Sequence, residues 1–597
     1  MWYAYTPVQD TTITITTHVD GYPDVDTRFN VYKGLCNALV CVSGDDDSGP
    51  NYSSIVTFPV QGGITYLITF DNYWSSNGFT FQLVETIGQQ PPQGEVLFTS
   101  QSIPGSGYIM GVVDMNGDGL DDAVTPGYTQ IQVSYQQTGG GFSPVSYTTT
   151  PADYTASWSM AAGDFDGNGF TDLMYGGGSG VTFMKANDTG TGFTEVSFPQ
   201  YVFSQRTNFV DINNDGHLDA FVCHDVAANV YFLNDGSGNL SFNQGGFGNT
   251  CGNYGSIWTD INNDGHVDCF IAKCGCDPQD VLLEYNTGVS YTNLAGTLGL
   301  ADSHQSWSSA WGDFDNDGDM DVLIGSSSSS IHKLLLNTGG TFTNVTPGSG
   351  FDGLNNQSIE WTTHDFNNDG WLDVLGGNTL MYNNGDMTFS PGSSVPYNGC
   401  VGDLNNDGFL DVAYGSAAFM NQGNGNNWIK IIPVGLLSNK QGIGARVSVT
   451  SALGTQIRDI KSGDGFEFMS SLTAHFGLGA DTEVEQVTVH WPNGTMDVID
   501  APAINGTLTV VEGLTTGLSE VGPEAIGIYP NPVKDVVTIS GVGNGALQVA
   551  VFDGIGKQVR SGIAVNGRYD LQGLSAGTYV LRITTVDGPV LRRFVKG

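Results

Sequence analysis

A nine-residue segment rich in carboxylate and amide side chains occurs seven times in this chain. Positions 1, 3, 5 and 9 of each copy are Asp or Asn, and position 6 is always Gly. Oxygen ligands at alternate positions of a tight turn can converge on one hard cation, with the carbonyl of position 7 as a further ligand. Glycine at position 6 permits the sharp turn. The copies are DMNGDGLDD from Asp114, DFDGNGFTD from Asp164, DINNDGHLD from Asp211, DINNDGHVD from Asp260, DFDNDGDMD from Asp313, DFNNDGWLD from Asp365 and DLNNDGFLD from Asp403.

The pattern predicts about seven Ca²⁺ ions, one in each loop. The predicted ligands hold 22 carboxylates, so seven divalent ions would neutralise 14 of these charges. Without an ion, carboxylates this close would repel one another. The predicted metal ligands are Asp114, Asn116, Asp118, Asp122, Asp164, Asp166, Asn168, Asp172, Asp211, Asn213, Asp215, Asp219, Asp260, Asn262, Asp264, Asp268, Asp313, Asp315, Asp317, Asp321, Asp365, Asn367, Asp369, Asp373, Asp403, Asn405, Asp407 and Asp411.

Two other interpretations compete with the calcium loop. Asp, Asn and Gly also form ordinary turns, but turn chemistry does not require Asp at position 9 in all seven copies. An EF-hand has a bidentate Glu at position 12 and a helix after it. Position 12 here is never Glu, and strand-like segments such as DVLIG and DVAYG follow instead.

Strands must position these loops. Successive copies begin 50, 47, 49, 53, 52 and 38 residues apart, which is the length of one four-stranded propeller blade. Alternating segments such as TTITITTHV and the 84 glycines are typical of short strands between tight turns. We predict an all-β fold: a seven-bladed calcium-binding β-propeller flanked by small β-sandwich domains. The segment EVLFTS, from residue 95, is expected to complete the last blade and close the ring.

The charge balance limits the possible partners. Asp and Glu outnumber Lys and Arg by 61 to 19, for a formal charge of −42, which argues against nucleic acid or an anionic membrane surface. The sequence contains no run of 18 or more apolar residues, so no transmembrane helix is predicted. The chain opens on the strand-like MWYAYTPV without a secretory signal, and eight cysteines favour export. We predict a disulfide between Cys36 and Cys41 and another from Cys251 to Cys274 or Cys276.

The loops resemble the FG-GAP or VCBS repeats of integrin α-chain propellers and many secreted bacterial proteins. The resemblance covers residues 95–425. It implies that each calcium loop joins the innermost strand of a blade to the next strand, on the bottom face. It implies a fold and no particular ligand.

Three further segments complete the predicted domain organisation. Residues 426–512 contain SNKQGIGARVSV, HFGLG and VTVHWPNG, and resemble the ASPIC/UnbV domain of the cartilage acidic protein family. Residues 524–597 contain IGIYPNPVKDVVTIS and LSAGTYVLRI, and resemble the C-terminal sorting domain of the Bacteroidetes type IX secretion system. That resemblance implies export to the cell surface, with an upstream signal peptide cut away or lying outside this sequence. Residues 1–92 resemble a pre-peptidase C-terminal β-sandwich, with the linker GQQPPQG after it; the turn Asp45–Asp47 is a solvated turn or an additional calcium site.

Aromatic residues recur six positions before the first Asp of the loops. If the innermost strand descends to the calcium loop, they encircle the opposite mouth of the channel. There they could stack on sugar rings or anchor a protein loop. The alternative is that they fill the channel and pack between blades. These positions are Tyr108, Trp158, Gln205, Tyr254, Trp307, Ile359 and Tyr397, of which Tyr108, Trp158, Tyr254, Trp307 and Tyr397 are the candidate ligand-binding residues.

No motif for a metalloprotease, a serine hydrolase or a phosphate-binding loop is present, so we do not expect an enzyme. We predict a secreted or surface-attached, non-catalytic interaction or adhesion protein. Its partners would be an extracellular protein or glycan, together with the type IX secretion machinery. One alternative is a glycan-binding lectin. The other is a calcium-dependent polysaccharide lyase or hydrolase, for which only Arg206 is placed near the upper mouth.

Overall fold

The computed structural model describes residues 2–7, 11–19, 21–35, 38–60, 64–71, 78–86, 94–326, 332–354, 358, 360–513, 526–542, 545–554, 556–585 and 588–597. It is all-β. Within these ranges the helical elements are two 3-10 turns, Pro50–Tyr52 and Phe351–Gly353. None of the described helices has the length and apolar character needed to span a membrane.

Residues 98–421 form seven antiparallel sheets of four strands each, one per repeat. The strands of the first four sheets are β9 (Gly111–Val113), β10 (Asp122–Thr125), β11 (Gln130–Gln136), β12 (Phe142–Thr148); β13 (Ser159–Gly163), β14 (Asp172–Gly176), β15 (Val181–Ala186), β16 (Phe193–Ser197); β17 (Ser204–Val210), β18 (Asp219–His224), β19 (Val230–Asn234), β20 (Leu240–Gln244); and β21 (Asn253–Thr259), β22 (Asp268–Lys273), β23 (Val281–Thr287), β24 (Ser290–Asn293). Those of the last three are β25 (Ser306–Gly312), β26 (Asp321–Ser326), β27 (Lys333–Asn337), β28 (Phe342–Asn344); β29 (Trp361–His364), β30 (Asp373–Gly376), β31 (Thr379–Asn383), β32 (Phe389–Pro391); and β33 (Cys400–Gly402), β34 (Asp411–Tyr414), β35 (Ala417–Asn421), β8 (Phe98–Ser102).

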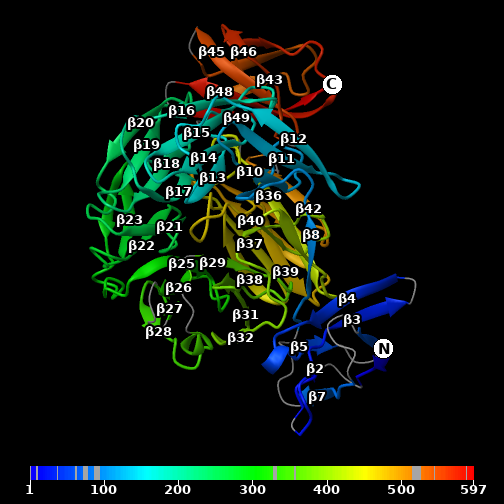
Figure 1. The fold of residues 1–597 in the computed structure, drawn as a ribbon. Helices are drawn as coiled ribbons and strands as arrows, with labels where there is room; N and C mark the ends of the chain where they lie inside the picture. The colour runs from blue at the N-terminus through cyan, green and yellow to red at the C-terminus, as the bar shows by residue number, and fades with distance from the viewer. Residues whose placement is uncertain are drawn as a thin grey trace.

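The sheets follow one another around a common centre (Figure 1). The first strand of each sheet contacts the first strand of the next from β9 to β29, and β33 contacts β9. These first strands are covered on both faces, which is why β13 and β17 are buried along their whole length. The fourth strands lie at the periphery, and β12 is largely exposed. We call this arrangement the ring.

A strand from before the first repeat closes the ring. β8 pairs antiparallel with β35, with Phe98 opposite Asn421 and Ser102 opposite Ala417. This confirms the prediction that the segment after residue 94 completes the last sheet. Joining the two ends of the ring through hydrogen bonds removes a sheet edge that would otherwise be open.

Residues 427–511 form two further sheets. One contains β39 (Ala474–Gly479), β36 (Asn427–Val434) and β42 (Thr507–Val511); the other contains β38 (Gly454–Asp459), β37 (Arg446–Ser451), β40 (Val484–His490) and β41 (Met496–Asp500). Their apolar side chains share one core with the second and third sheets of the ring, in which Ile429 and Val447 join Phe209 and Phe232. These sheets therefore pack directly on the ring.

The connection between β38 and β39 enters the centre of the ring. We call residues 459–473 the plug. Met469 pairs with β9 like an extra strand: its N–H donates to the Met110 carbonyl at 2.9 Å, and the Val112 N–H donates to its carbonyl at 2.9 Å. Ser462 forms a similar bridge with Phe209 of β17.

The plug contacts the first strand of all seven sheets. Besides β9 and β17, its partners are Met160 in β13, Thr259 in β21, Trp311 in β25, His364 in β29 and Val401 in β33. A segment of the same chain thus occupies the axial space of the ring, and a cavity of about 80 Å³ remains between the plug and Trp311, His364 and Val401. The sequence predicted a channel along this axis, either open at an aromatic mouth or filled by the aromatic side chains, and did not predict that a segment from residues 459–473 enters it.

The two ends of the chain form further β bodies outside the ring, and the C-terminal one packs on residues 427–511 through a shared core that includes Val434, Val511 and Phe552. Near the N-terminus, a sheet of β1 (Trp2–Tyr5), β6 (Tyr66–Phe70), β3 (Phe29–Leu35) and β4 (Ala38–Asp45) packs through a shared core on a sheet of β5 (Ile55–Val60), β2 (Thr11–Thr16) and β7 (Gln82–Thr86). This arrangement agrees with the expected sandwich. Cys36 and residues 88–93 of the linker lie outside the described residues.

The C-terminal body encloses one apolar core to which strands from both halves of its sheet contribute, for example Val537 and Tyr569 from one half and Leu581 and Phe594 from the other. Its strands form one continuous sheet, because β46 pairs on one side with β47 and on the other with β45. In spatial order the sheet contains β43 (Gly527–Tyr529), β44 (Val536–Ser540), β47 (Arg568–Asp570), β46 (Gln558–Val565), β45 (Ala546–Phe552), β48 (Gly577–Thr585) and β49 (Gly588–Lys596).

Because the plug contacts the first strand of all seven sheets, we expect the ring and residues 427–511 to unfold together. Phe468 is 3% exposed. Its replacement by Ala is expected to lower the free energy of unfolding by about 3 kcal/mol, because removal of a large buried side chain leaves a cavity. Calorimetry of the full chain should show one shared transition for both parts, shifted to lower temperature in Phe468→Ala. Tyr201→Ala, at a residue that is 59% exposed, serves as control. Two separate transitions in the unmodified chain, with only one of them moved by Phe468→Ala, would contradict the coupling.

Candidate functional site

The seven predicted calcium loops share one backbone conformation. Each joins the first strand of a sheet to the second, and position 6 has a positive φ in all of them, from 81° at Gly119 to 94° at Gly370. Position 4 also has a positive φ, and it is Gly117 or Gly167 in two loops and Asn in five, as at Asn214. Gly and Asn tolerate this left-handed conformation best. The sequence analysis missed position 4, although its restriction to Gly or Asn was visible.

Position 1 organises the loop from inside. In the first loop, one carboxylate oxygen of Asp114 accepts hydrogen bonds from the N–H groups of Gly117 at 2.7 Å and Asn116 at 3.1 Å, and the other accepts from Gly119 at 2.7 Å. The bond from the position-6 N–H recurs in all seven loops at 2.7–3.0 Å. The chain therefore wraps around this carboxylate and turns the side chains of positions 3 and 5 to the same side.

Position 9 fastens the loop to the sheet. One oxygen of Asp321 accepts from the Phe314 N–H at 3.0 Å, and the other accepts from the Asn337 N–H in β27 at 2.8 Å. Equivalent pairs of bonds occur at Asp122, Asp172, Asp219, Asp268, Asp373 and Asp411. This double role explains why Asp stands at position 9 in every copy.

The carboxylates of the loops are held in an electrostatically unfavourable setting. Burial first, and then the like charges of the neighbouring loop carboxylates, raise the pKa of Asp122, Asp219 and Asp321 to about 8 and that of Asp268 to about 7. Burial and then the like charges of Asp164 and Asp166 also raise the pKa of Asp172. A positive charge inside the loop would offset both effects.

The donor set fits a calcium ion. The converging groups are carboxylate and amide oxygens with no nitrogen or sulfur, which is the ligand chemistry of a hard cation. In two loops, three carboxylates each place an oxygen within 4.8 Å of the others: Asp164, Asp166 and Asp172, and Asp313, Asp315 and Asp317. The described acidic residues contain one more such group, formed by Asp26, Asp46 and Asp47 at the N-terminal turn.

Residues 427–511 pack on the calcium-loop side of the ring and bring cations to it. The Lys430 ammonium lies 2.7 Å from a carboxylate oxygen of Asp403 and 2.7 Å from the side-chain oxygen of Asn406. Arg446 forms an ion pair with Asp459 and donates to the main-chain carbonyl of Asp260. Two of the loops are thus partly neutralised from outside by this neighbouring domain.

The predicted aromatic positions lie at the opposite end of the ring, around the tip of the plug. Tyr254 packs on Trp307 with ring centroids 6.3 Å apart and on Phe466 of the plug at 6.3 Å. Tyr108 contacts Phe468 at 6.3 Å, and its hydroxyl donates to Glu467 at 2.8 Å. Four of the five candidate residues therefore border one surface, since Tyr397 joins it through Tyr414, whose ring contacts Tyr397 at 5.2 Å and Tyr108 at 5.8 Å.

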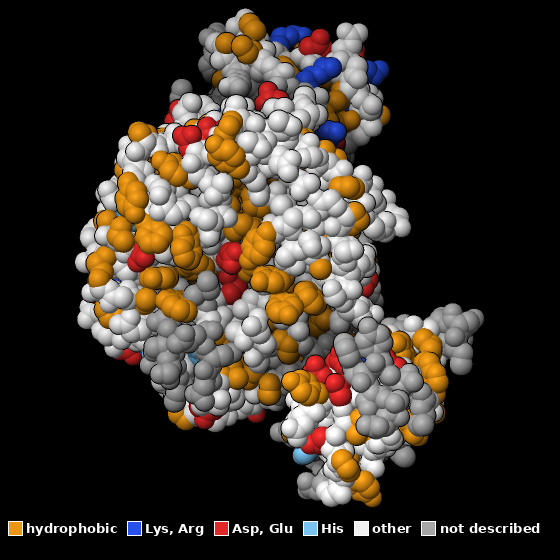
Figure 2. All heavy atoms as spheres, in the orientation of Figure 1, with side chains coloured by type: hydrophobic (Ala, Val, Ile, Leu, Met, Phe, Trp, Pro, Cys, Tyr) orange, Lys and Arg blue, Asp and Glu red, His pale blue; other side chains and the backbone are white. Residues whose placement is uncertain are grey.

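We call this surface the mouth; it consists of Tyr108, Tyr254, Trp307, Tyr397, Tyr414, Phe466, Glu467 and Phe468. Figure 2 shows hydrophobic side chains gathered around a small acidic patch at the middle of the ring. Trp158 is not part of the mouth by its ring contacts, because it packs on Phe203 at 5.8 Å. Ile359 lies outside the described residues, and Gln205 is buried.

Arg206 is not available to a ligand, which corrects its predicted place at the upper mouth. It is fully buried beneath the plug, where its guanidinium donates to the carbonyls of Phe466 at 2.9 Å and Phe468 at 2.8 Å. Glu360, also buried, accepts the N–H groups of Phe466 and Glu467, and burial raises its pKa to about 8. Both side chains hold the plug in position.

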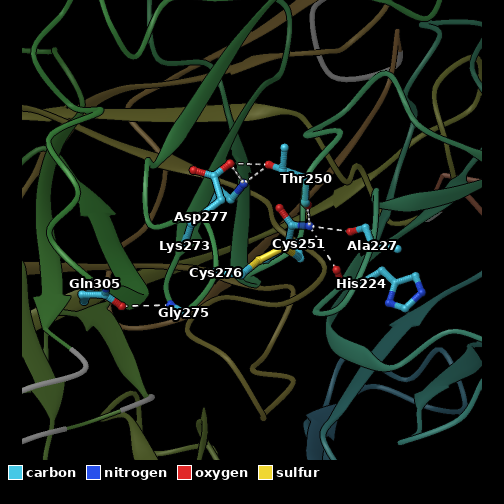
Figure 3. The surroundings of a disulfide bond; sticks show 10 residues. His224, Ala227, Thr250, Cys251, Lys273, Gly275, Cys276, Asp277 and Gln305 are labelled. Atoms are coloured by element: carbon cyan, nitrogen blue, oxygen red, sulfur yellow. Dashed lines mark hydrogen bonds and ion pairs between the residues drawn. A yellow bond between two sulfur atoms is a disulfide. The ribbon is translucent and has the colours of Figure 1, made fainter.

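A disulfide between Cys251 and Cys276 lies near the mouth and confirms the predicted bond, with Cys276 as the partner. Figure 3 shows Lys273 beside it, with its ammonium 3.0 Å from Asp277 and 2.6 Å from the Thr250 hydroxyl. Cys274 is a free thiol that accepts a hydrogen bond from the Trp307 indole N–H at 3.2 Å. The disulfide ties the loop before β21 to the loop after β22.

Amide side chains at the end of the third strand connect neighbouring sheets and were missed from the sequence. Asn234, Asn383 and Asn421 each donate to a carbonyl of the preceding sheet, namely those of Phe165 at 2.6 Å, Phe314 at 2.8 Å and Phe366 at 2.8 Å. In the sequence, each of these Asn residues follows two apolar residues, in the segments FLND, MYNN and FMNQ, and this shared pattern could have revealed them.

Comparison with protein families matches three parts of the chain. A model described as FG-GAP-like repeat matches residues 114–175, 164–222, 211–271, 260–324, 313–376 and 365–414, which together span residues 114 to 414, or 301 of 597 residues. A model described as ASPIC and UnbV matches residues 435–516, and one described as Secretion system C-terminal sorting domain matches residues 527–597.

The curated relatives include cartilage acidic protein 1 of mouse and of human. Each is 38% identical over 79 residues, which is 13% of this chain and 12% or 11% of the relative, so the chain matches only about an eighth of their length. Among solved structures, BBS1N in complex with ARL6DN has 10% identity and a TM-score of 0.35 over 55% of this chain and 96% of that one. The extracellular domain of a putative hybrid two component system from B. thetaiotaomicron has 8% identity and a TM-score of 0.37 over 97% and 68%. Because both TM-scores are below 0.5, these two similarities support no inference about a ligand of this chain.

Calcium removal is expected to destabilise the ring. At ~1 mM Ca²⁺ and a dissociation constant of ~10⁻⁴ M, each filled loop would add about 1.4 kcal/mol to the free energy of unfolding. A chelator should therefore lower the melting temperature of the full chain substantially. Titration calorimetry should find about seven bound ions, and one fewer in Asp317→Ala, which loses the position-5 carboxylate of one loop.

Asp188→Ala is the matched control, since Asp188 lies exposed in a hairpin outside the loops. It should keep the full ion count. Equal melting temperatures with calcium and with chelator, together with no measurable ion binding, would refute the calcium assignment.

Proposed function

Because this chain belongs to the FG-GAP-like repeat family and carries a C-terminal secretion sorting domain, we propose that it is a calcium-stabilised, seven-bladed β-propeller that acts outside the cell as a non-catalytic interaction protein. The sorting domain makes it a secreted or cell-surface protein that uses the type IX secretion machinery. The seven four-stranded sheets are the blades, and one Ca²⁺ in each loop joins the first two strands of a blade.

The proposed division of the chain follows the same reasoning. Residues 1–92 form the N-terminal sandwich, 95–425 the propeller, 426–512 the ASPIC/UnbV domain and 524–597 the sorting domain. Calcium has a structural role in this proposal, since all the proposed ligands lie in loops that connect the first and second strands. Each bound ion would relieve the repulsion among the buried carboxylates and fasten a blade from within.

The exposure of aromatic side chains at the mouth carries the interaction proposal. Tyr108, Tyr397 and Tyr414 are 43%, 53% and 36% exposed. Large, rigid aromatic side chains with one polar group are the usual anchors of a protein interface. Because the plug occupies the axial space behind them, a partner would bind on the surface and not pass through the ring.

Two alternatives have different support. A lectin remains the second candidate, because the same aromatic rings could stack on sugars. A calcium-dependent polysaccharide lyase or hydrolase is disfavoured, because Arg206, the cation that the sequence placed near the upper mouth, is buried beneath the plug.

Parallel arrays separate these functions. The purified full chain is applied, with millimolar Ca²⁺ and then with chelator, to an array of extracellular proteins and peptides and to a broad glycan array. We expect calcium-dependent binding to protein or peptide spots and no products from a panel of polysaccharides. Binding confined to glycans would replace the proposal with the lectin. Product formation would overturn the non-catalytic assignment, and absence of binding to both arrays by folded protein would overturn the interaction function.

A further inference from the structure

The mouth is built jointly by the ring and the plug. Phe466 and Phe468 of the plug pack on two different groups of aromatic residues: Phe466 on the group at the fourth and fifth sheets, and Phe468 on the group at the first and seventh. Glu467 stands between them in the chain. Its partly exposed carboxylate accepts a hydrogen bond from Tyr108 at 2.8 Å, above the buried side chains of Phe466 and Phe468, so the ring and the plug both contribute to this part of the mouth.

The Glu467 carboxylate has no cationic partner within the described residues. No described Lys, Arg or His lies within 4.0 Å of it, and it accepts a hydrogen bond from the hydroxyl of Tyr108. Asp225, next to Tyr254, is a second partly exposed carboxylate at this end of the ring, and it accepts from the Gln205 amide at 3.4 Å. Partly buried carboxylates without a counter-ion attract cations.

The ring supplies no free cation that could neutralise them. Residues 95–425 contain 37 Asp and Glu but only four Lys and Arg. Arg206 is buried under the plug, and Lys273 is 1% exposed and paired with Asp277 at 3.0 Å. Lys333 pairs with Asp302 at 2.7 Å, and Lys185 pairs with Asp166 in a calcium loop at 2.9 Å. In Figure 2 the visible Lys and Arg side chains are concentrated on the C-terminal domain, away from the ring.

From this charge complementarity and the aromatic surroundings, we propose that the mouth recognises a cationic side chain, Lys or Arg, on a protein partner, with Glu467 as its counter-ion. An alkyl-ammonium or guanidinium group would enter between the aromatic clusters, where ring faces attract cations and the apolar stem is desolvated. The Tyr108 hydroxyl orients the carboxylate. This inference deepens the proposed function and rests on it, because it names the chemistry of the partner at the same surface.

A neutral glycan fits the observations less well. Sugar recognition requires several polar groups in addition to aromatic faces. Gln205, the amide nearest to Asp225, is 1% exposed and therefore unavailable to a ligand. A single carboxylate flanked by aromatic rings matches a cation better. An anionic polysaccharide would be repelled by both Glu467 and the net charge of the ring.

The test uses immobilised peptides that differ at one position. Ac-Gly-Ser-Gly-X-Gly-Ser-Gly, with X as Lys, Arg, norleucine, Gln or Glu, is printed beside the glycan array and probed with labelled full chain in millimolar Ca²⁺ and physiological salt. We expect signal for Lys and Arg and background for norleucine, Gln and Glu. Norleucine retains the apolar stem of Lys without its charge, so it separates cation recognition from apolar docking.

Variants locate the binding to the mouth. Glu467→Gln should weaken binding to the Lys and Arg peptides about tenfold. Glu485→Gln is the matched control, because it makes the same change in net charge at an exposed position of β40 and should bind as the unmodified chain does. If Glu467→Gln disturbs the plug, as its melting temperature would reveal, Tyr414→Leu tests the aromatic wall separately and should give a loss of several-fold.

The possible outcomes distinguish failure of the cation site from failure of the proposed interaction function. Equal binding to norleucine and Lys, or equal losses in Glu467→Gln and Glu485→Gln, would overturn the cation site. In either case protein binding in the larger array would still support the interaction function. Binding to glycans with none to the Lys and Arg peptides would overturn both in favour of the lectin.

Discussion

A closed ring of sheets leaves an axial space that must be occupied, and here the chain occupies it with its own plug. The consequences reach both ends of the ring. At one end, residues 427–511 are brought against the calcium loops, where Lys430 and Arg446 meet acidic residues. At the other end, the plug tip supplies the partly exposed Glu467, and the buried Phe466 and Phe468 support the aromatic rings around it. The ring and the neighbouring domain therefore form one structural unit.

The seven loops rich in Asp and Asn provide the acceptors for backbone N–H groups that the ring leaves unpaired between its first and second strands. Each sheet needs a tight connection between its buried first strand and its second, and backbone N–H groups in that connection must find acceptors. The carboxylates of positions 1 and 9 accept these bonds, as Asp114 and Asp122 do in the first sheet. The same carboxylates carry negative charge into a buried site. An ion in the loop and cations from the neighbouring domain are two compatible ways of compensating this charge.

The features that the sequence revealed are those set by local chemistry and by repetition. The loops, their spacing and the closing strand at residues 98–102 follow from residue types and intervals, and the pairing of Cys251 was narrowed to two partners. The plug was not predicted, because SGDGFEFMS has the composition of an ordinary Gly-containing turn and its place in the ring is a tertiary property. For the same reason Arg206, at the start of an innermost strand, was expected near the mouth although the plug covers it.

The pairing of β8 with β35 also determines when the ring can be completed. Phe98 and Asn421 are opposite each other across more than 300 residues of chain, and the plug follows only after residue 459. During synthesis, the first strand of the closing pair must therefore wait for the last sheet, and the apolar lining of the axis stays uncovered until later still. Contacts between residues so distant in sequence slow folding and prolong the lifetime of aggregation-prone intermediates. The nascent chain gains its closed form late and at nearly the same time as its binding surface, so a truncated product would have neither a plugged axis nor a mouth.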